Sequence, residues 1–431
     1  MLNTIKKHKG GISSSDYDNR GKIVITGIGA IAPNGIGVKS FWKSLKAGVN
    51  CIDFITFFDT SNHPTKIAAE IKNFDGTNYF PKEKSKKMAR ASQLATSAAI
   101  EAIEDGKFIL KNHEKNKIGI FLGSGAGGLG FYEKEISKIF QNISENVSED
   151  TMSASFAGAL LENIRNILGI DGPSLLFSNG CTSANDAIGI ATNMINSGIL
   201  EVALAGGADA CITSSIAEAF SCMGALSISN KYDPKSTCRP FNIDRDGFVI
   251  GEGAWIFILE SEEHALKRGA FIYAEVAGFG ATCDAYHATK PLPTGEEDAR
   301  AIQMALQDAN IMPEELSYIC AHGTSTPLND KTETLAIKTA LGKHAYFVPV
   351  SSIKSMIGHA VGGASAGSIA ACAMAIKDNF IPPTINYEKK DPECDLDYVP
   401  NTGRKIEVKT ALINSIGFGS KNAAVVLKKY S

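Results

Sequence analysis

The chain has 431 residues, which is enough for two or three domains and a large buried core. Its 43 Lys and Arg residues nearly balance 46 Asp and Glu residues, which leaves a formal net charge of −3. With 44% hydrophobic and 21% charged residues, this composition argues against a disordered chain and against a general nucleic-acid binder.

The first 21 residues form a polar segment with a basic start. The segment reaches no apolar stretch, so we expect a mobile arm and not a signal peptide. The nine cysteines are scattered and include no Cys-x-x-Cys pair, which argues against a zinc site or a disulfide framework and favours a cytoplasmic setting. Small side chains dominate residues 360–376, the longest weakly polar run, so we expect a buried helix there and no membrane span.

Short β-rich segments alternate with helical patterns along the chain. We expect a helix near residues 40–48 and strands at residues 22–29, 117–124, 174–180, 202–208, 255–260 and 274–281. The apolar runs show no period-two alternation and are separated by helices, which predicts parallel strands covered on both faces. The pattern therefore indicates an α/β protein.

A weak internal repeat divides the sequence. A strand, a tight turn and a helix of small residues occur at residues 174–192 and again at residues 346–371. We therefore expect two related halves with a boundary near residue 270, so that residues 22–270 form the first half and residues 271–431 the second.

Two glycine-rich stretches, at residues 27–32 and 123–128, follow predicted strands and fit the loose dinucleotide-binding fingerprint. An NAD-dependent oxidoreductase is therefore one hypothesis, although Pro33 would interrupt the phosphate-binding helix of the first turn. Tight glycine turns are the simpler interpretation. Residues 363–367 fit the Gly-x-Ser-x-Gly pattern of serine hydrolases, but no strand directly precedes Ser365, which we expect within a helix.

Cys181 follows the predicted strand at residues 174–180 and precedes a predicted helix. A thiol at a helix N-terminus faces unpaired amide groups, which lower its pKa and make the thiolate available as a nucleophile. The same amides can hold an oxyanion. A small buried cysteine at a tight turn is the alternative, and this segment alone does not decide between the two.

Two histidines lie in glycine-flanked turns further along the chain. His322 follows the apolar segment 317–320, and His359 lies in the second strand-turn-helix unit. A lone histidine is usually structural, but a cysteine and two histidines on repeated units suggest a convergent site. Lys354 and Glu333 are residue types that are usually solvated, yet as a buried pair they would orient the histidines electrostatically.

Seven motifs occur in order over residues 22–429. They are VITGIGAIAPNG (24–35), CTSANDAIG (181–189), RPFNIDRDGFVIGEGA (239–254), DAYHAT (284–289), AHGTSTPLNDKTE (321–333), IKSMIGH (353–359) and GFGSKN (417–422). Together they resemble the β-ketoacyl-[acyl-carrier-protein] synthases of the type II, thiolase-fold class. The resemblance implies a five-layered αβαβα fold of two similar halves, usually dimeric, with a nucleophilic cysteine at the foot of an acyl tunnel.

By this resemblance, Cys181 takes an acyl group from the phosphopantetheine arm of an acyl carrier protein. His322 and His359 then serve the decarboxylation of malonyl-carrier and the attack of the resulting carbanion, which is a Claisen condensation. Two neutral imidazole N–H groups stabilise the enolate without supplying a proton that would quench it. Lys354 and Glu333 match the family's supporting pair, and the chemistry demands no metal or tightly bound cofactor.

The resemblance also assigns a gate and a partner. The backbone N–H of Phe418 joins that of Cys181 in the acyl oxyanion hole, and the Phe418 ring gates the pocket. Acyl carrier proteins are typically acidic, so a basic cluster in the family's docking region is a candidate landing site, with a solvated helix face as the alternative. The cluster consists of Lys82, Lys84, Lys86, Lys87 and Arg90. A homodimer and a heterodimer with a chain-length factor are both compatible with the resemblance.

Three positions depart from the family's common pattern. Ser368 stands where a glutamate is expected, and Ser420 and Lys421 change the usual GFGGTN loop. We expect the loss of a buried charge, a stiffer gate hinge and a cation at the gate's rim.

The alternative function is a non-catalytic subunit resembling a chain-length factor, but such a subunit normally lacks the cysteine that Cys181 supplies. The stretch around Cys181 resembles polyketide ketosynthases at least as well as fatty-acid enzymes.

Overall fold

The computed structural model describes residues 21–228 and 233–431, so the arm expected at residues 1–21 lies outside the described residues apart from Gly21. Eleven strands form one hydrogen-bonded sheet with two halves of the same strand order. The first half has the order β6 (Ser174–Phe177), β5 (Ile118–Gly123), β7 (Val202–Ala210), β8 (Glu252–Ser261) and β1 (Ile23–Ala32). The second has the order β11 (Val350–Ser351), β10 (Tyr318–Cys320), β14 (Thr410–Gly417), β15 (Lys421–Lys428) and β9 (Ala274–Cys283).

The halves join through a short antiparallel pairing of β1 with β9, at Val24 and Ile25. Each half mixes strand directions. β6, β5 and β7 run parallel, whereas β8 runs antiparallel to both β7 and β1, and the second half repeats this arrangement. The expectation of parallel strands alone is therefore wrong for one strand in each half, β8 in the first and β15 in the second. Helices cover both faces of the sheet, so antiparallel strands here are as uniformly apolar as parallel ones.

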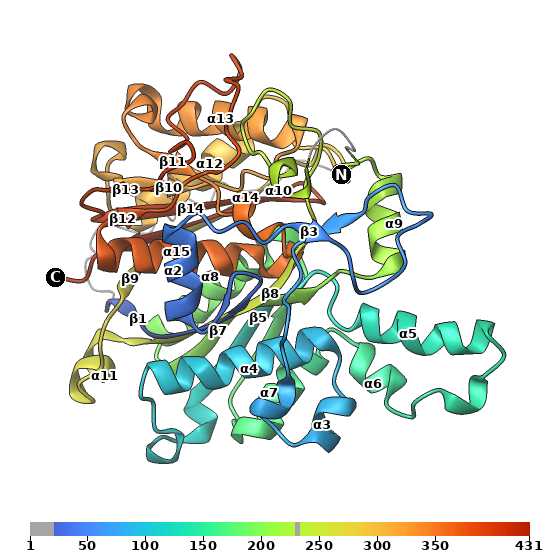
Figure 1. Cartoon of the computed structure of the whole chain (residues 1–431). Coiled ribbons are helices and arrows are strands. Elements are labelled where there is room, and N and C mark those ends of the chain that lie inside the picture. Colours follow the sequence, from blue (N-terminus) through green and yellow to red (C-terminus); the bar gives the residue numbers. More distant parts are fainter. Residues whose placement is uncertain (1–20, 229–232) are drawn as a thin grey trace, which may run out of the picture.

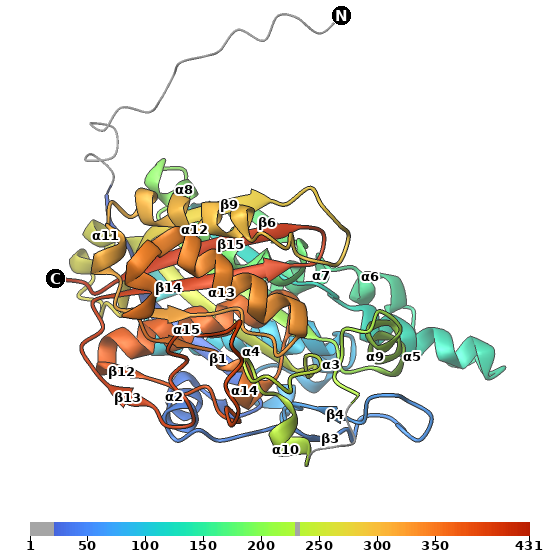
Figure 2. The same cartoon turned by 90° about the horizontal axis from the view of Figure 1, so that it is seen from above.

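Helices form three layers around the two sheet halves (Figures 1 and 2). The outer layer of the first half contains α4 (Arg90–Asp105) and α7 (Ala159–Leu168), and that of the second contains α12 (Glu296–Asp308) and α13 (Pro327–Leu341). The central layer contains α8 (Ser183–Asn196) and α15 (Ala364–Asp378), which contact each other and both sheet halves. This order of helix, sheet, helix, sheet and helix confirms the expected αβαβα architecture.

The remaining helices and strands lie outside this list of layers. The helices are α2 (Val38–Lys46), α3 (Lys82–Lys86), α5 (Leu129–Phe140), α6 (Thr151–Ser155), α9 (Ser214–Cys222), α10 (Pro234–Thr237), α11 (Glu262–Lys267) and α14 (Lys354–Ile357). The remaining strands are β2 (Gly35–Ile36), β3 (Asp53–Phe54), β4 (Ile67–Ala68), β12 (Phe380–Ile381) and β13 (Arg404–Lys405). The 3₁₀ turns used below are η2 (Leu110–Asn112), η5 (Gly180–Thr182) and η8 (Val361–Gly363).

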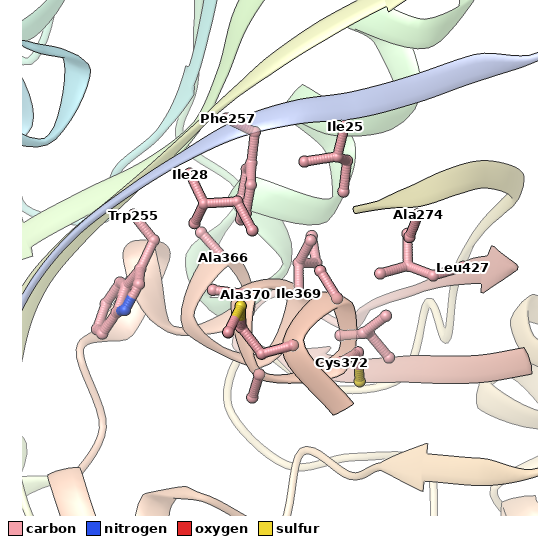
Figure 3. Close-up of a cluster of buried hydrophobic side chains, with 14 of the residues drawn as sticks. Ile25, Ile28, Trp255, Phe257, Ala274, Ala366, Ile369, Ala370, Cys372 and Leu427 are labelled. Carbon is pink, nitrogen blue, oxygen red and sulfur yellow. The ribbon is translucent and has the colours of Figure 1, made fainter. Parts of the chain in front are cut away.

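The centre of the core lies where α15 packs against β1 and β8 (Figure 3). Ile369 and Ala370 of α15 belong to the same buried cluster as Ile25 and Phe257. Every residue from Ala364 to Ile376 is buried, which confirms the buried helix expected in this region and places Ser365 inside it. Small side chains let this helix approach both sheet halves closely. Within residues 21–228 and 233–431, no helix is both long and apolar enough to cross a membrane.

The glycines at positions 27 and 29 serve packing. They lie inside β1, where an added Cβ would come within 2.3 Å of the Ala102 carbonyl oxygen or 1.8 Å of the Ala98 carbonyl oxygen of α4. A side chain at either position would therefore push the helix off the sheet. The first glycine-rich stretch is thus a helix-packing site within a strand, and the expectation of a tight turn here is wrong.

Candidate active site

Cys181, His322 and His359 come together although they lie far apart in the sequence. Cys181 lies in η5, between β6 and α8, whereas His322 follows β10 and His359 follows α14. The Nε2 atom of His359 lies 3.1 Å from the Sγ atom of Cys181. The ligand-type atoms of the three side chains all lie within 4.8 Å of one another. The first half therefore supplies the thiol and the second half supplies both imidazoles.

The three side chains line one cavity of about 350 Å³. Phe220, Met223, Phe248, Val361 and Phe418 contribute apolar surface to its wall. Only small fractions of the three reactive side chains are exposed, between 3% and 6%. Chemistry in this cavity is therefore shielded from bulk water, which strengthens polar interactions with a bound substrate.

Burial dominates the ionisation of the cysteine. It raises the pKa of the Cys181 thiol to about 12, although the charge of Lys354 and the backbone N–H of Phe418 oppose this rise. The expectation that the helix N-terminus lowers the pKa is therefore wrong for the free protein, because the desolvation of a thiolate outweighs the amides that face it. The thiol must lose its proton as it attacks, and the nearest base is Nε2 of His359.

Both imidazoles are neutral in this environment. Burial lowers the pKa of His322 and His359 well below the usual value, and the positive charge of Lys354 adds to the effect. The Nδ1 atom of each ring has no hydrogen-bond partner among the described residues. These Nδ1 atoms have almost no exposed surface, whereas both rings line the cavity that holds Cys181.

Glu333 and Lys354 fix His322 through its backbone. One carboxylate oxygen of Glu333 accepts the N–H of His322 at 2.6 Å and the other accepts the N–H of Gly323 at 2.7 Å, while the Lys354 ammonium donates to the His322 carbonyl oxygen at 2.6 Å. Burial raises the pKa of Glu333 and lowers that of Lys354. The two residues act on the same loop from opposite sides, which the sequence alone did not reveal.

Asp209 was missed by the sequence analysis. Its fully buried carboxylate accepts hydrogen bonds from the N–H groups of Gly125 and Ala126, from the Ser124 hydroxyl and from the N–H of Gly362. The amides of the second glycine-rich turn are thus already occupied by a carboxylate and cannot bind a phosphate. An acidic residue near the end of an otherwise small and apolar strand was the available signal.

Asn414 is a second residue that the sequence analysis missed. Its side-chain amide donates to Glu333 at 3.0 Å and to Asp298 at 3.1 Å. Asn329 adds a weaker contact of 3.4 Å to Glu333. A polar residue inside the apolar strand TALINSIG was the signal that marks Asn414 as a hydrogen-bonding position.

The loop that carries Phe418 is tied to a second loop. Ser420, at a positive φ of 62°, donates its hydroxyl to the His287 carbonyl oxygen at 2.8 Å, and its own carbonyl accepts the N–H of Asp284 at 2.9 Å. Lys421 faces Asp186 of α8, where burial raises the pKa of the carboxyl and the charge of Lys421 opposes that rise. The cation expected at the gate's rim therefore lies beside an acidic partner.

The five basic candidates for docking do not line the cavity that holds Cys181. Four lysines lie exposed on or beside α3, but the guanidinium of Arg90 binds Glu252 at 2.6 and 2.7 Å and also donates to the Ile71 carbonyl oxygen. Arg90 is therefore a structural residue that anchors the start of α4. Lys86 pairs with Glu83 at 3.0 Å at the surface.

Comparisons with known proteins agree with this geometry. The profile of the beta-ketoacyl synthase N-terminal domain matches residues 20–265, and that of the C-terminal domain matches residues 273–388. The chain is 43% identical to 3-oxoacyl-[acyl-carrier-protein] synthase 2 of Synechocystis sp. and 40% identical to the protein of that name from Staphylococcus aureus. Each alignment covers 95% of this chain and 98% of the relative.

Solved structures with the same fold include ketosynthases of polyketide pathways. The ishigamide ketosynthase/chain length factor gives a TM-score of 0.89 at 35% identity, with 96% of this chain and all of that chain covered. A type II polyketide ketosynthase, bound to a hexaketide and in complex with its acyl carrier protein, gives a TM-score of 0.87 at 33% identity, with the same coverage of both chains.

Replacing Glu333 by Gln tests the support of His322. The amide NH2 group would face hydrogen-bond donors in place of a carboxylate oxygen, so we expect a loss of about 1.5–3 kcal/mol in the free energy of unfolding. Amide hydrogen exchange at His322 and Gly323 should accelerate. Glu314→Gln, at an exposed position, is the matched control and should change neither quantity. Equal exchange rates in the two variants would contradict the role of Glu333.

Proposed function

Because the chain belongs to the β-ketoacyl synthase family, we propose that Cys181, His322 and His359 carry out its reaction. It is an acyltransferase that condenses an acyl group with malonyl-[acyl-carrier-protein] to give a 3-oxoacyl-carrier product, in fatty acid or polyketide synthesis. The observation that supports the residue assignment best is the contact of 3.1 Å between the thiol and an imidazole, inside a cavity that also holds the second imidazole.

The first step transfers the acyl group to the enzyme. Sγ of Cys181 attacks the carbonyl carbon of the acyl thioester, and the thiol proton passes by way of His359 to the departing phosphopantetheine sulfur. The backbone N–H groups of Cys181 and Phe418 both face Sγ and oppose the rise of its pKa. The same groups are placed to hold the negative oxygen of the tetrahedral intermediate, and the step ends with a Cys181 thioester and a free carrier thiol.

The second step forms the carbon–carbon bond. The malonyl group loses CO2, and the electron pair of the broken bond becomes an enolate whose oxygen accepts hydrogen bonds from His322 and His359. The enolate carbon attacks the Cys181 thioester, the thiolate leaves and takes up a proton, and the 3-oxoacyl-carrier remains. The depressed pKa values of both rings suit this step, because neutral donors stabilise the enolate without protonating it.

The chain's own residues supply every group in these steps, and the substrates arrive on the phosphopantetheine arm of an acyl carrier protein. No tightly bound cofactor enters the proposal. The alternative, a non-catalytic partner subunit, is not favoured, because the thiol and both imidazoles are present and close together. We place the reaction in the cytoplasm, which the nine free cysteines support.

The assembly is a dimer of two ketosynthase chains. β6 is the edge strand of the first sheet half, and Leu175 on this strand is 46% exposed. Phe140 and Phe156 on the neighbouring arm of α5 and α6 are 82% and 62% exposed, which a lone globular chain seldom tolerates. Light scattering should give twice the chain mass of 45.8 kDa, and a monomer at micromolar concentration would overturn the proposal.

The two sheet topologies support a boundary of the halves near residue 270.

Alanine variants separate the roles of Cys181 and His322. Cys181→Ala should abolish transfer of the acyl group from acyl-carrier to the enzyme, because no other cysteine among the described residues lines the cavity. His322→Ala should retain loading of Cys181 but lose about 10²-fold or more in CO2 release from malonyl-carrier. Intact-mass spectrometry measures loading, and labelled malonyl-carrier measures CO2 release. Full loading of the Cys181 variant would refute the assignment.

The release of CO2 should depend little on pH. The pKa of both imidazoles is lowered well below 6.5, so their charged forms appear only far below that pH and the neutral donors persist as the pH falls. Enzyme acylated beforehand on Cys181 should release CO2 at similar rates between about pH 8 and about pH 6. An ordinary imidazole would lose most of its neutral form over this range. A sharp fall in rate centred near pH 6.5 would contradict neutral histidines.

The four exposed lysines remain the proposed carrier-docking surface, whereas Arg90 is left out because Glu252 holds it. Lys82→Glu combined with Lys84→Glu should raise the KM for acyl-carrier several-fold and leave turnover of a short pantetheine thioester unchanged, since the charges act on encounter with an acidic partner. Lys343→Glu, another exposed lysine, is the matched control. An unchanged KM in the double variant would remove this surface from the proposal.

A further inference from the structure

Two histidines and a glutamate form a cluster remote from Cys181. His113 follows η2, His264 lies on α11, and Glu201 directly precedes β7. Their ligand-type atoms all lie within 4.8 Å of one another. β5 and β7 are parallel, and Glu201 lies at their amino ends, whereas Gly123 at the carboxyl end pairs with the end of the strand that leads to Cys181. The cluster and the reactive cysteine thus lie at opposite ends of the sheet.

The ring of His264 is held in one tautomer. Its Nδ1 atom contacts the carboxylate of Glu260, a side chain with no exposed surface. Arg268 donates to the same carboxylate, which therefore serves as an acceptor for the N–H of His264 Nδ1. The Nε2 atom is then the ring nitrogen that points away from Glu260 and can bind a ligand. A carboxylate behind the ring in this way is typical of metal-binding histidines.

The ring of His113 presents a second nitrogen to the same point. It stacks on Phe108, with ring centroids 4.3 Å apart and an angle of 12° between the planes. Its Nδ1 atom lies 3.4 Å from Nε2 of His264, long for a hydrogen bond. Two nitrogens on a tetrahedral zinc ion, each about 2.0–2.1 Å from the metal, lie roughly 3.3 Å apart.

From this geometry we propose that His113, His264 and Glu201 bind a zinc ion. Glu201 is exposed, so its side chain can rotate to bring a carboxylate oxygen to the metal. Arg268 neutralises the charge of Glu260 through several hydrogen bonds, and Glu201 contributes the remaining negative charge of the site. Two imidazoles and one carboxylate match zinc and not calcium or magnesium, and water fills the fourth position.

The zinc ion would join three separate segments of the first half. The turn before β5, the start of β7 and α11 would be linked through one metal, which stabilises the native state in proportion to zinc occupancy. The site uses no cysteine, so it is independent of the cysteine spacing that argued against zinc. It also lies outside the condensation machinery, and its loss should leave acyl loading of Cys181 intact.

Calorimetric titration of the metal-free full-length protein with zinc sulfate tests the proposal. Cys181, His322 and His359 are also metal-ligand types within reach of one another, so the titration is repeated with Cys181→Ala. We expect one tight site in the wild type that persists in Cys181→Ala and in the control His344→Ala. His113→Ala with His264→Ala should lose at least 10²-fold in affinity. Substituted cobalt should give the intense visible absorption of a tetrahedral site only where zinc binds.

Glu201→Gln provides a variant at an exposed position where folding is not at risk, and it should weaken zinc binding by about tenfold or more. Zinc should also raise the melting temperature of the wild type but not that of the double histidine variant. Equal zinc affinity of the wild type and the double variant would overturn the proposal. Loss of zinc binding in Cys181→Ala alone would also overturn the proposal. The same holds if the wild type binds no zinc at 0.1 mM.

Discussion

The carboxylate of Asp209 joins the two halves of the molecule where the reactive side chains meet. It accepts N–H groups of the turn after β5, which belongs to the first half, and the N–H of Gly362, which lies three residues after His359. An added Cβ on Gly362 would lie 2.3 Å from the N atom of Gly125, so the two turns have no room for a side chain between them. The position of His359 relative to Cys181 depends on this contact between backbones.

The sequence predicted most of the fold and the meeting of Cys181, His322 and His359 in one site. The strand-turn-helix units around Cys181 and His359 were visible because apolar runs lead directly into turns of small residues. The sequence did not show that β8 and β15 run antiparallel to their neighbours, because a strand that is buried on both faces is uniformly apolar in either direction. Likewise, the ionisation of Cys181 depends on how much water surrounds it, which no local pattern of residues records.

The surroundings of Lys354 show how this chain accommodates its departures from the family's pattern. Ser368 stands where a glutamate is expected, and it contacts Cys320 next to the loop of His322. The Cys372 thiol, Ser368 and the nearby Lys354 hold the pKa of Cys320 at about 7 against the effect of burial. A polarised thiol thus faces the buried ammonium in this chain. Burial and the charge of Lys354 together lower the pKa of both imidazoles.

The equal strand order of the two sheet halves has a consequence for the origin of the enzyme. α8 and α15 occupy matching places, yet Cys181 precedes α8 and His359 precedes α15. An ancestor made of a single half would have had to pair with its twin, and both copies would have carried the same side chains. One chain that contains both halves has no such symmetry, so each half can supply a different part of the chemistry.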